Sequence, residues 1–152
     1  MPLDIAFADS RWRRLRGFEK LLARAHALTL TKPQAAKITA LSLSNNAQVK
    51  TLNKEWRGKN KPTNVLSFPA ADVKLPRGAI KPLGDIILAY ETCAKEAKAA
   101  GKTVSDHAIH LTVHGLLHLI GHDHMDEAEA HKMETKEIRI LAKLGIANPY
   151  LL

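Results

Sequence analysis

The sequence contains a single cysteine, Cys93, among its 152 residues. One thiol cannot form an intrachain disulfide, and disulfides are typical of exported proteins, so this composition favours a reducing compartment. The chain also lacks an apolar run long enough to cross a bilayer. Its first residues lack the basic segment followed by an apolar stretch that marks a secretion signal. We therefore expect a soluble cytoplasmic protein with no membrane contact.

Internal repeats, low-complexity tracts and linkers are also missing from the chain. A length of 152 residues is sufficient for one domain whose hydrophobic core needs no disulfides. We therefore predict a single domain over residues 1–152.

Negative charge is scarce, because 15 acidic residues face 23 Lys and Arg, for a formal net charge of +8 at pH 7. A positive surface of this size attracts polyanions such as RNA. One basic group is best explained as a solvated helix face and comprises Arg11, Arg13, Arg14, Arg16 and Lys20. A second group lies in a turn-rich loop and comprises Arg57, Lys59 and Lys61, next to Trp56. Because such a loop can contact phosphates and a base, Trp56, Lys59 and Lys61 are RNA-binding candidates.

Apolar periodicity and turn residues predict an alternation of helices and strands. The expected strands cover 38–43, 65–68 and 84–89, and the expected helices cover 12–25, a segment capped by Asn46, 91–100, a segment capped by Ser105, and a segment from Asp126 to Gly145. The last two strands should be antiparallel and joined by a loop. Together these elements predict an α+β domain in which several helices flank a small mixed β-sheet.

Five of the eight histidines lie within residues 110–124. His114 and His118 are four residues apart, so a helix presents both imidazoles on one face. Gly121 can adopt the left-handed conformation that ends a helix and returns His124 to the same ion. Three imidazoles with an open fourth position are typical of catalytic Zn²⁺, for which nickel or copper could substitute. We predict one zinc site on this helix and the following turn, the alternative being a histidine-rich helix with ordinary hydrogen bonds.

The glutamate that a zinc peptidase would need is missing. The spacing H-x₃-H-x₅-H is also that of the metzincin peptidases, which carry their general base directly after the first histidine. Gly115 occupies that position here. A metallopeptidase is therefore disfavoured, and the basic surface disfavours it further.

Three segments together resemble the YbeY family of single-strand-specific metallo-endoribonucleases. They are residues 52–69, which include LNKEWRG and KPTNVLSFP, residues 83–86, which read LGDI, and residues 114–124, which read HGLLHLIGHDH. The resemblance implies that His114, His118 and His124 bind zinc and that Arg57 is important for activity. It also implies cleavage of single-stranded RNA, maturation of the 3′ end of small-subunit (16S) rRNA and late ribosome quality control, with the small ribosomal subunit as partner. His122 stands where many members have tyrosine.

Further roles follow from residue chemistry around this site. The planar guanidinium of Arg57 can hold a phosphate through two parallel hydrogen bonds. Asp85 and Asp123 are candidates to accept a hydrogen bond from a ligand imidazole, which usually donates its second N–H to a carboxylate or carbonyl. His110 lies one helical turn before His114, so we expect it beside the ligands and not among them. The attacking group is left open between hydroxide on the metal and the 2′-oxygen of RNA.

A non-enzymatic alternative is a ribosome-assembly factor that binds rRNA and uses the metal only for structure. A closed structural zinc site needs a fourth protein ligand, and the lone Cys93 lies outside the motif. The open site therefore favours an enzyme.

Overall fold

The computed structural model describes residues 2–71 and 74–151 of the chain. Within these residues the strands are β1 (Leu3–Phe7), β2 (Ile38–Ser44), β3 (Val65–Pro69) and β4 (Pro82–Ala89). The helices are the 3₁₀ helix η1 (Ser10–Arg14), α1 (Phe18–Thr29), α2 (Lys32–Ala35), α3 (Asn46–Arg57), α4 (Tyr90–Ala99), α5 (Val104–Leu119) and α6 (Glu127–Lys143). These elements confirm the predicted α+β class.

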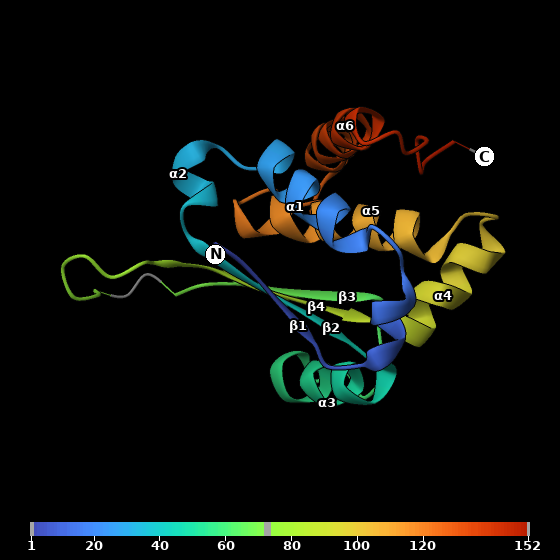
Figure 1. Ribbon diagram of the computed structural model, residues 1–152, viewed down its shortest axis with the longest axis horizontal. Helices are drawn as coiled ribbons and strands as arrows, with labels where there is room; N and C mark the ends of the chain where they lie inside the picture. Colours follow the sequence, from blue (N-terminus) through green and yellow to red (C-terminus); the bar gives the residue numbers. More distant parts are fainter. Residues whose placement is uncertain (1, 72–73, 152) are drawn as a thin grey trace.

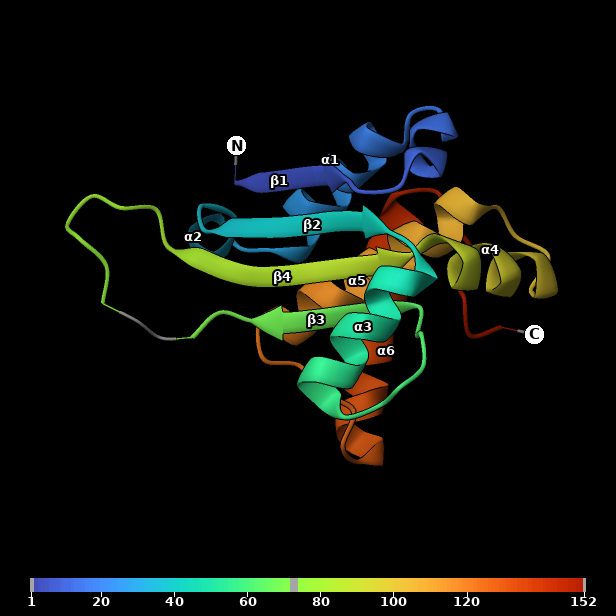
Figure 2. The same cartoon turned by 90° about the horizontal axis from the view of Figure 1, so that it is seen from below.

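The four strands form one mixed sheet in the order β1-β2-β4-β3. β1, β2 and β4 are parallel, whereas β3 pairs antiparallel with β4, as predicted for the strands on either side of the loop. Figure 2 shows β1 and β3 at the two edges, with the β3–β4 loop extending beyond the sheet. This topology makes β3 an antiparallel edge strand next to β4.

Helix α5 forms the middle of the hydrophobic core. The sheet lies between α3 on one face and α1, α5 and α6 on the other (Figure 1). Most residues of α5 are buried, since this helix packs against β3 and β4 on one side and against α1, α4 and α6 on the others. A helix enclosed in this way is fixed in position, and so are the side chains that it carries.

Two glycines allow α5 to lie close to the sheet. A Cβ atom added at Gly115 would lie 3.2 Å from side-chain atoms of Ile86 on β4. At Gly84, where φ is +154°, it would lie 2.5 Å from the carbonyl oxygen of Phe68 and 2.6 Å from Cδ2 of Leu119. The C-terminal half of α5 is therefore seated directly on β3 and β4.

The predicted helix over 12–25 is wrong as a single element. Gly17 adopts φ 69° and separates η1 from α1. Trp12 is fully buried in η1, and its Nε1 donates a hydrogen bond of 2.8 Å to the carbonyl oxygen of Ser44. The apolar spacing thus correctly indicated helical structure in this region but not the break in the backbone at Gly17.

Other boundaries differ by one or two residues. Asn45 caps α3 in place of Asn46, and Thr103 caps α5 in place of Ser105. Each cap side chain accepts a hydrogen bond from a backbone N–H of the first helical turn. β1 and α2 were not predicted at all. Asp126 caps α6 as predicted, through a 2.8 Å hydrogen bond from the backbone N–H of Glu129.

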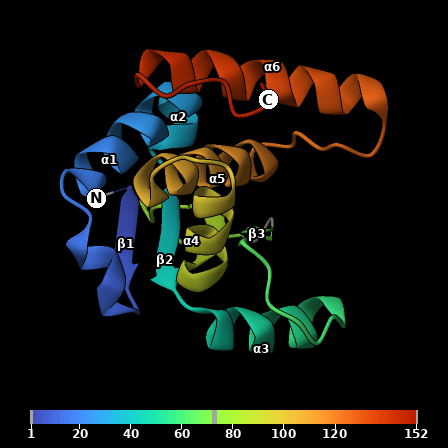
Figure 3. The ribbon, with the colours of Figure 1, turned by 90° about the vertical axis from the view of Figure 1, so that its right-hand side faces the viewer.

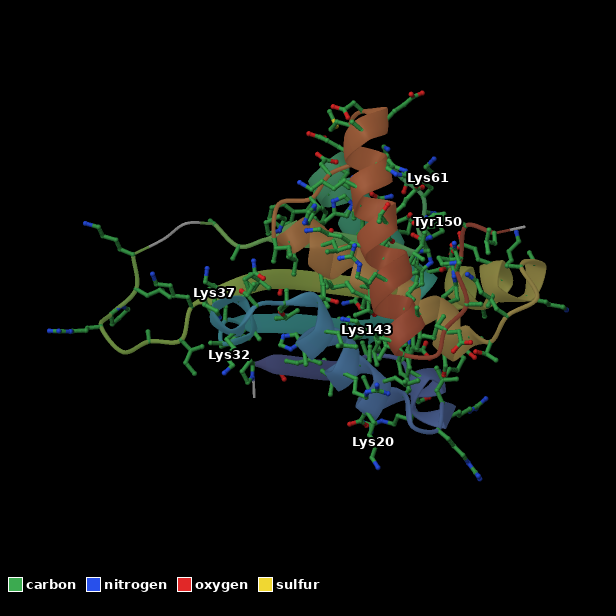
Figure 4. All side chains as sticks on the ribbon, turned by 90° about the horizontal axis from the view of Figure 1, so that it is seen from above. Lys20, Lys32, Lys37, Lys61, Lys143 and Tyr150 are labelled. Atoms are coloured by element: carbon green, nitrogen blue, oxygen red, sulfur yellow. The ribbon has the colours of Figure 1, made fainter. Side chains whose placement is uncertain are left out.

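Helix α6 forms the outermost layer and crosses above α5 (Figure 4). It buries one stripe of side chains, Met133, Glu137, Ile140 and Leu141, and exposes a charged face. Among the helices of residues 2–71 and 74–151, none combines the length and apolarity needed to cross a membrane.

We predict that Gly84→Ala destabilises the protein strongly, because the new methyl group would meet a backbone oxygen that cannot move aside. The expected loss is about 2–4 kcal/mol, which lowers the melting temperature by roughly 4–16 °C. Gly115→Ala is the control, since its methyl group meets only the adaptable side chain of Ile86. Its stability should stay within about 1 kcal/mol of wild type. Equal melting temperatures for Gly84→Ala and wild type would contradict the close packing at β4.

Candidate metal centre

Three imidazoles converge at the C-terminal end of α5. His114 and His118 extend from its last turns, and His124 lies in the loop over residues 120–126. The Nε2 atoms of His114 and His118 are 3.1 Å apart, and one nitrogen from each of the three rings lies within 4.8 Å of the others. This cluster could hold a metal ion, as the histidine spacing predicts.

The end of α5 returns His124 toward the helix. Gly121 adopts φ 99°, a conformation that favours glycine, and its N–H donates to the carbonyl oxygen of His118 at 3.1 Å. The N–H of His122 donates to the carbonyl oxygen of Leu117 at 2.9 Å. The chain is thereby turned back, and the ring centroid of His124 lies 5.1 Å from that of His118.

The donor set fits a divalent ion such as Zn²⁺. Metal–nitrogen bonds at tetrahedral angles separate two nitrogens by about 3.3 Å, close to the spacing of the His114 and His118 Nε2 atoms. Burial, followed by positive charge on His114 and His124, lowers the pKa of His118. The neutral ring, which is the form that binds metal, is therefore favoured. Because His124 is exposed, the cluster is open to solvent on one side.

A buried carboxylate lies behind the cluster and was not predicted. Glu137 of α6 is fully buried, and its Oε1 accepts hydrogen bonds from Nδ1 of His114 at 3.1 Å and Nε2 of His110 at 3.0 Å. Its Oε2 accepts a 2.8 Å hydrogen bond from the hydroxyl of Tyr150, which Figure 4 labels beside α6. Burial alone would raise the pKa of Glu137, but the hydrogen bonds outweigh it and lower the pKa to about 2.

A sequence signal for Glu137 does exist. This residue occupies a position of the apolar stripe on α6, between Met133 and Ile140, where a charge is costly to bury without partners. A charged residue on an apolar stripe indicates a specific buried contact.

The three residues predicted to support the ligands have different surroundings. Asp123 lies beside His124, because its Oδ1 accepts a 2.7 Å hydrogen bond from the backbone N–H of His124 and is 3.9 Å from that ring's Nδ1. His110 reaches the ligands only through Glu137. The structure does not bring Asp85 to the cluster. Its side chain is exposed on the other face of the sheet, where it lines a hollow together with Trp56.

The basic loop begins where α3 ends. Arg57 is the last residue of this helix and is exposed, and Gly58 follows with φ 69°. Asn53, which is 1% exposed, donates through Nδ2 to the carbonyl oxygen of Lys61 at 2.8 Å and accepts the N–H of Lys59 at its own carbonyl oxygen. The backbone of the loop is therefore fixed, while its cationic side chains face solvent.

Trp56 is 70% exposed, although the helix periodicity puts it on the same side as Val49 and Leu52. Its ring lies 6.3 Å from that of Phe68 and borders a hollow of about 400 Å³ on the α3 face of the sheet. An exposed indole of this kind is available for stacking with a planar ring.

The basic loop and the histidine cluster both lie near the β3 edge of the sheet, although they are on opposite faces of it (Figure 3). Figure 3 shows the C-terminal end of α3 and the loop between α5 and α6 both on the β3 side of the sheet, at opposite faces. The β3 edge therefore lies between the basic loop and the histidines.

Known proteins match almost the whole chain. Residues 8–145 match the family described as Endoribonuclease YbeY. An Endoribonuclease YbeY of Azorhizobium caulinodans is 45% identical over 158 aligned residues, which cover 100% of this chain and 98% of the relative. Another, of Ruegeria pomeroyi, is 43% identical and covers 99% of this chain and 98% of its own length. The solution structure of TM1509 from Thermotoga maritima matches with a TM-score of 0.60 over 94% of this chain and 91% of that chain, and at 21% identity it shows the fold alone. With its histidine cluster, its fold and these full-length relatives, the chain belongs to the YbeY endoribonuclease family.

Proposed function

We propose that this endoribonuclease uses a zinc ion held by His114, His118 and His124 to cleave single-stranded RNA. The observation that carries the proposal is the convergence of three imidazole nitrogens within 4.8 Å, with one ring exposed. Nickel or copper would fit the same nitrogens, because three imidazoles do not by themselves select zinc.

When bound, such an ion supplies Lewis acidity toward a phosphate oxygen and lowers the pKa of a water molecule. The protein's own groups bind and orient the RNA. Arg57 presents an exposed guanidinium that can hold a phosphate through two hydrogen bonds and stabilise the negative charge that develops on it. Asp123 limits the motion of the exposed His124 by fixing the backbone of its turn.

A single strand is the substrate that fits these surfaces. The exposed ring of Trp56 can stack on an unpaired base, and Lys59 and Lys61 can pair with successive phosphates of the same strand. A strand bound to this loop and crossing the β3 edge would reach the histidine cluster.

We further propose that the RNA is the 3′ end of small-subunit (16S) rRNA, processed on or near the small ribosomal subunit, with a role in late ribosome quality control. Membership of the YbeY family and the net charge of +8 support this assignment. Incubation with precursor small-subunit particles, followed by sequencing of the RNA 3′ ends, tests it. Unchanged 3′ ends in the presence of active enzyme would contradict this role but not the cleavage chemistry.

Zinc-reconstituted protein should contain one divalent ion per chain, and His114→Ala should contain none. The ion should be released as the pH falls, because protons compete with metal for the ligand nitrogens, and the lowered pKa of His118 extends binding to lower pH. Elemental analysis after dialysis at several pH values measures this. The control is His131→Ala, which removes an exposed histidine outside the cluster and should keep full occupancy.

Arg57→Ala should reduce the rate of single-turnover RNA cleavage by about 10²-fold, the scale of losing one donor to a transition-state charge, and weaken RNA binding much less. Arg57→Lys should restore only part of the rate, because an ammonium lacks the planar pair of donors. Lys50→Ala removes another exposed cation of α3 and should cleave normally. Wild-type cleavage by folded, zinc-loaded Arg57→Ala would exclude Arg57 from the reaction.

RNA affinity should decrease steeply with salt, because binding to a surface of this charge releases counterions from several phosphates. The slope of log K against log salt concentration measures the number of contacts. Changing Lys59 and Lys61 together to alanine should reduce this slope by about one to two. An unchanged slope in the double variant would mean that the RNA contacts another basic surface.

A further inference from the structure

The carboxylate of Glu137 determines which nitrogen of His114 faces the cluster. An ionised carboxylate can only accept hydrogen bonds, and Oε1 of Glu137 lies 3.1 Å from Nδ1 of His114. In a neutral imidazole the single N–H must therefore be at Nδ1. The lone pair of Nε2 then points away from Glu137, toward Nε2 of His118 at 3.1 Å.

Glu137 is itself held by groups from two other parts of the chain. His110, one turn before His114 on α5, donates from Nε2 to Oε1, and Tyr150 of the C-terminal segment donates to Oε2. The rings of His110 and Tyr150 also pack edge to face at 5.6 Å. A buried carboxylate without partners would be expensive, so these donors both permit the charge and fix its orientation.

This arrangement also explains why His110 is not a ligand. Its Nε2 is used by Glu137, and its Nδ1 is buried without a hydrogen-bond partner. His110 thus acts on the cluster indirectly, by orienting the Glu137 carboxylate, which in turn orients His114.

We propose that Glu137 is the positioning residue of the metal centre, fixing His114 in the Nδ1–H tautomer and directing its Nε2 at the ion, while His110 and Tyr150 hold Glu137 in place. This inference rests on the metal-binding function proposed above. It adds that a fully buried glutamate of another helix, outside the ligand motif, sets the affinity of the site.

Glu137→Gln tests the proposal, because glutamine has the same shape but an amide that can either donate or accept. Long-range ¹H–¹⁵N NMR of the metal-free proteins at pH 8 reports the tautomer of His114. We expect the Nδ1–H form in wild type and a mixture of tautomers in Glu137→Gln. Zinc affinity, measured by competition with a chromophoric chelator, should fall 10- to 100-fold. Glu127→Gln makes the same charge change at an exposed position of α6 and should retain wild-type affinity.

Tyr150→Phe keeps the test decisive if Glu137→Gln does not fold. Tyr150→Phe removes one donor to the buried Glu137 carboxylate and keeps the two histidine donors, so we expect a folded protein with a lower melting temperature and a several-fold lower zinc affinity. Wild-type zinc affinity in Tyr150→Phe, or in folded Glu137→Gln, would overturn the proposal. Different results would contradict the proposed metal function and the proposed role of Glu137. A wild-type protein with the Nδ1–H tautomer but no zinc binding would contradict the metal function, whereas mixed tautomers in a zinc-binding wild type would overturn the role of Glu137.

Discussion

The distance between α5 and β4 is the constraint on which the functional groups depend. Gly115 allows the helix to approach Ile86, and Gly84 allows the strand to approach Leu119 at the end of the same helix. Because two of the clustered histidines extend from the last turns of α5, any change in this distance would move both imidazoles together. This mostly buried helix therefore acts as a rigid support, and of the three clustered histidines His124 alone lies in a loop.

The surface of the protein and the interior behind the histidines carry charges of opposite sign. The surface is strongly positive, with a formal net charge of +8, which suits a polyanionic substrate. Directly behind the histidines, the buried Glu137 places a negative charge in a medium of low polarity, where it acts more strongly than a surface carboxylate. A cation in the cluster would thus be favoured locally in a protein that repels cations at long range, and the two effects do not conflict because solvent screens the surface charges.

Sequence patterns predicted those parts of the site that depend on residues close together in the chain. The three clustered histidines lie within residues 114–124, so helix periodicity and one glycine turn are enough to bring them together. Glu137 contacts His114 because α6 packs on α5. The periodicity of a single helix does not predict which other helix it will pack against. β1 was not predicted for the same reason, since it pairs with β2, which is distant in the sequence. Asp85 lies away from the cluster because side chains alternate along β4, so that Asp85 and Ile86 point to opposite faces of the sheet. The sequence of β4 alone does not reveal which of these faces α5 will cover.

The close seating of Gly115 also bears on how hydrolases with this histidine spacing can diverge. Metzincin peptidases carry a glutamate at the corresponding position. Here the side chain of Ile86 can give way to a Cβ atom at 3.2 Å, but the further atoms of a glutamate would press on this fully buried residue and push the helix away from the sheet. A single substitution would then introduce the acid and misplace the histidines in the same event. Glutamate at position 115 would therefore need a matching change at Ile86 on β4 if the two histidine-bearing turns of α5 were to stay in place.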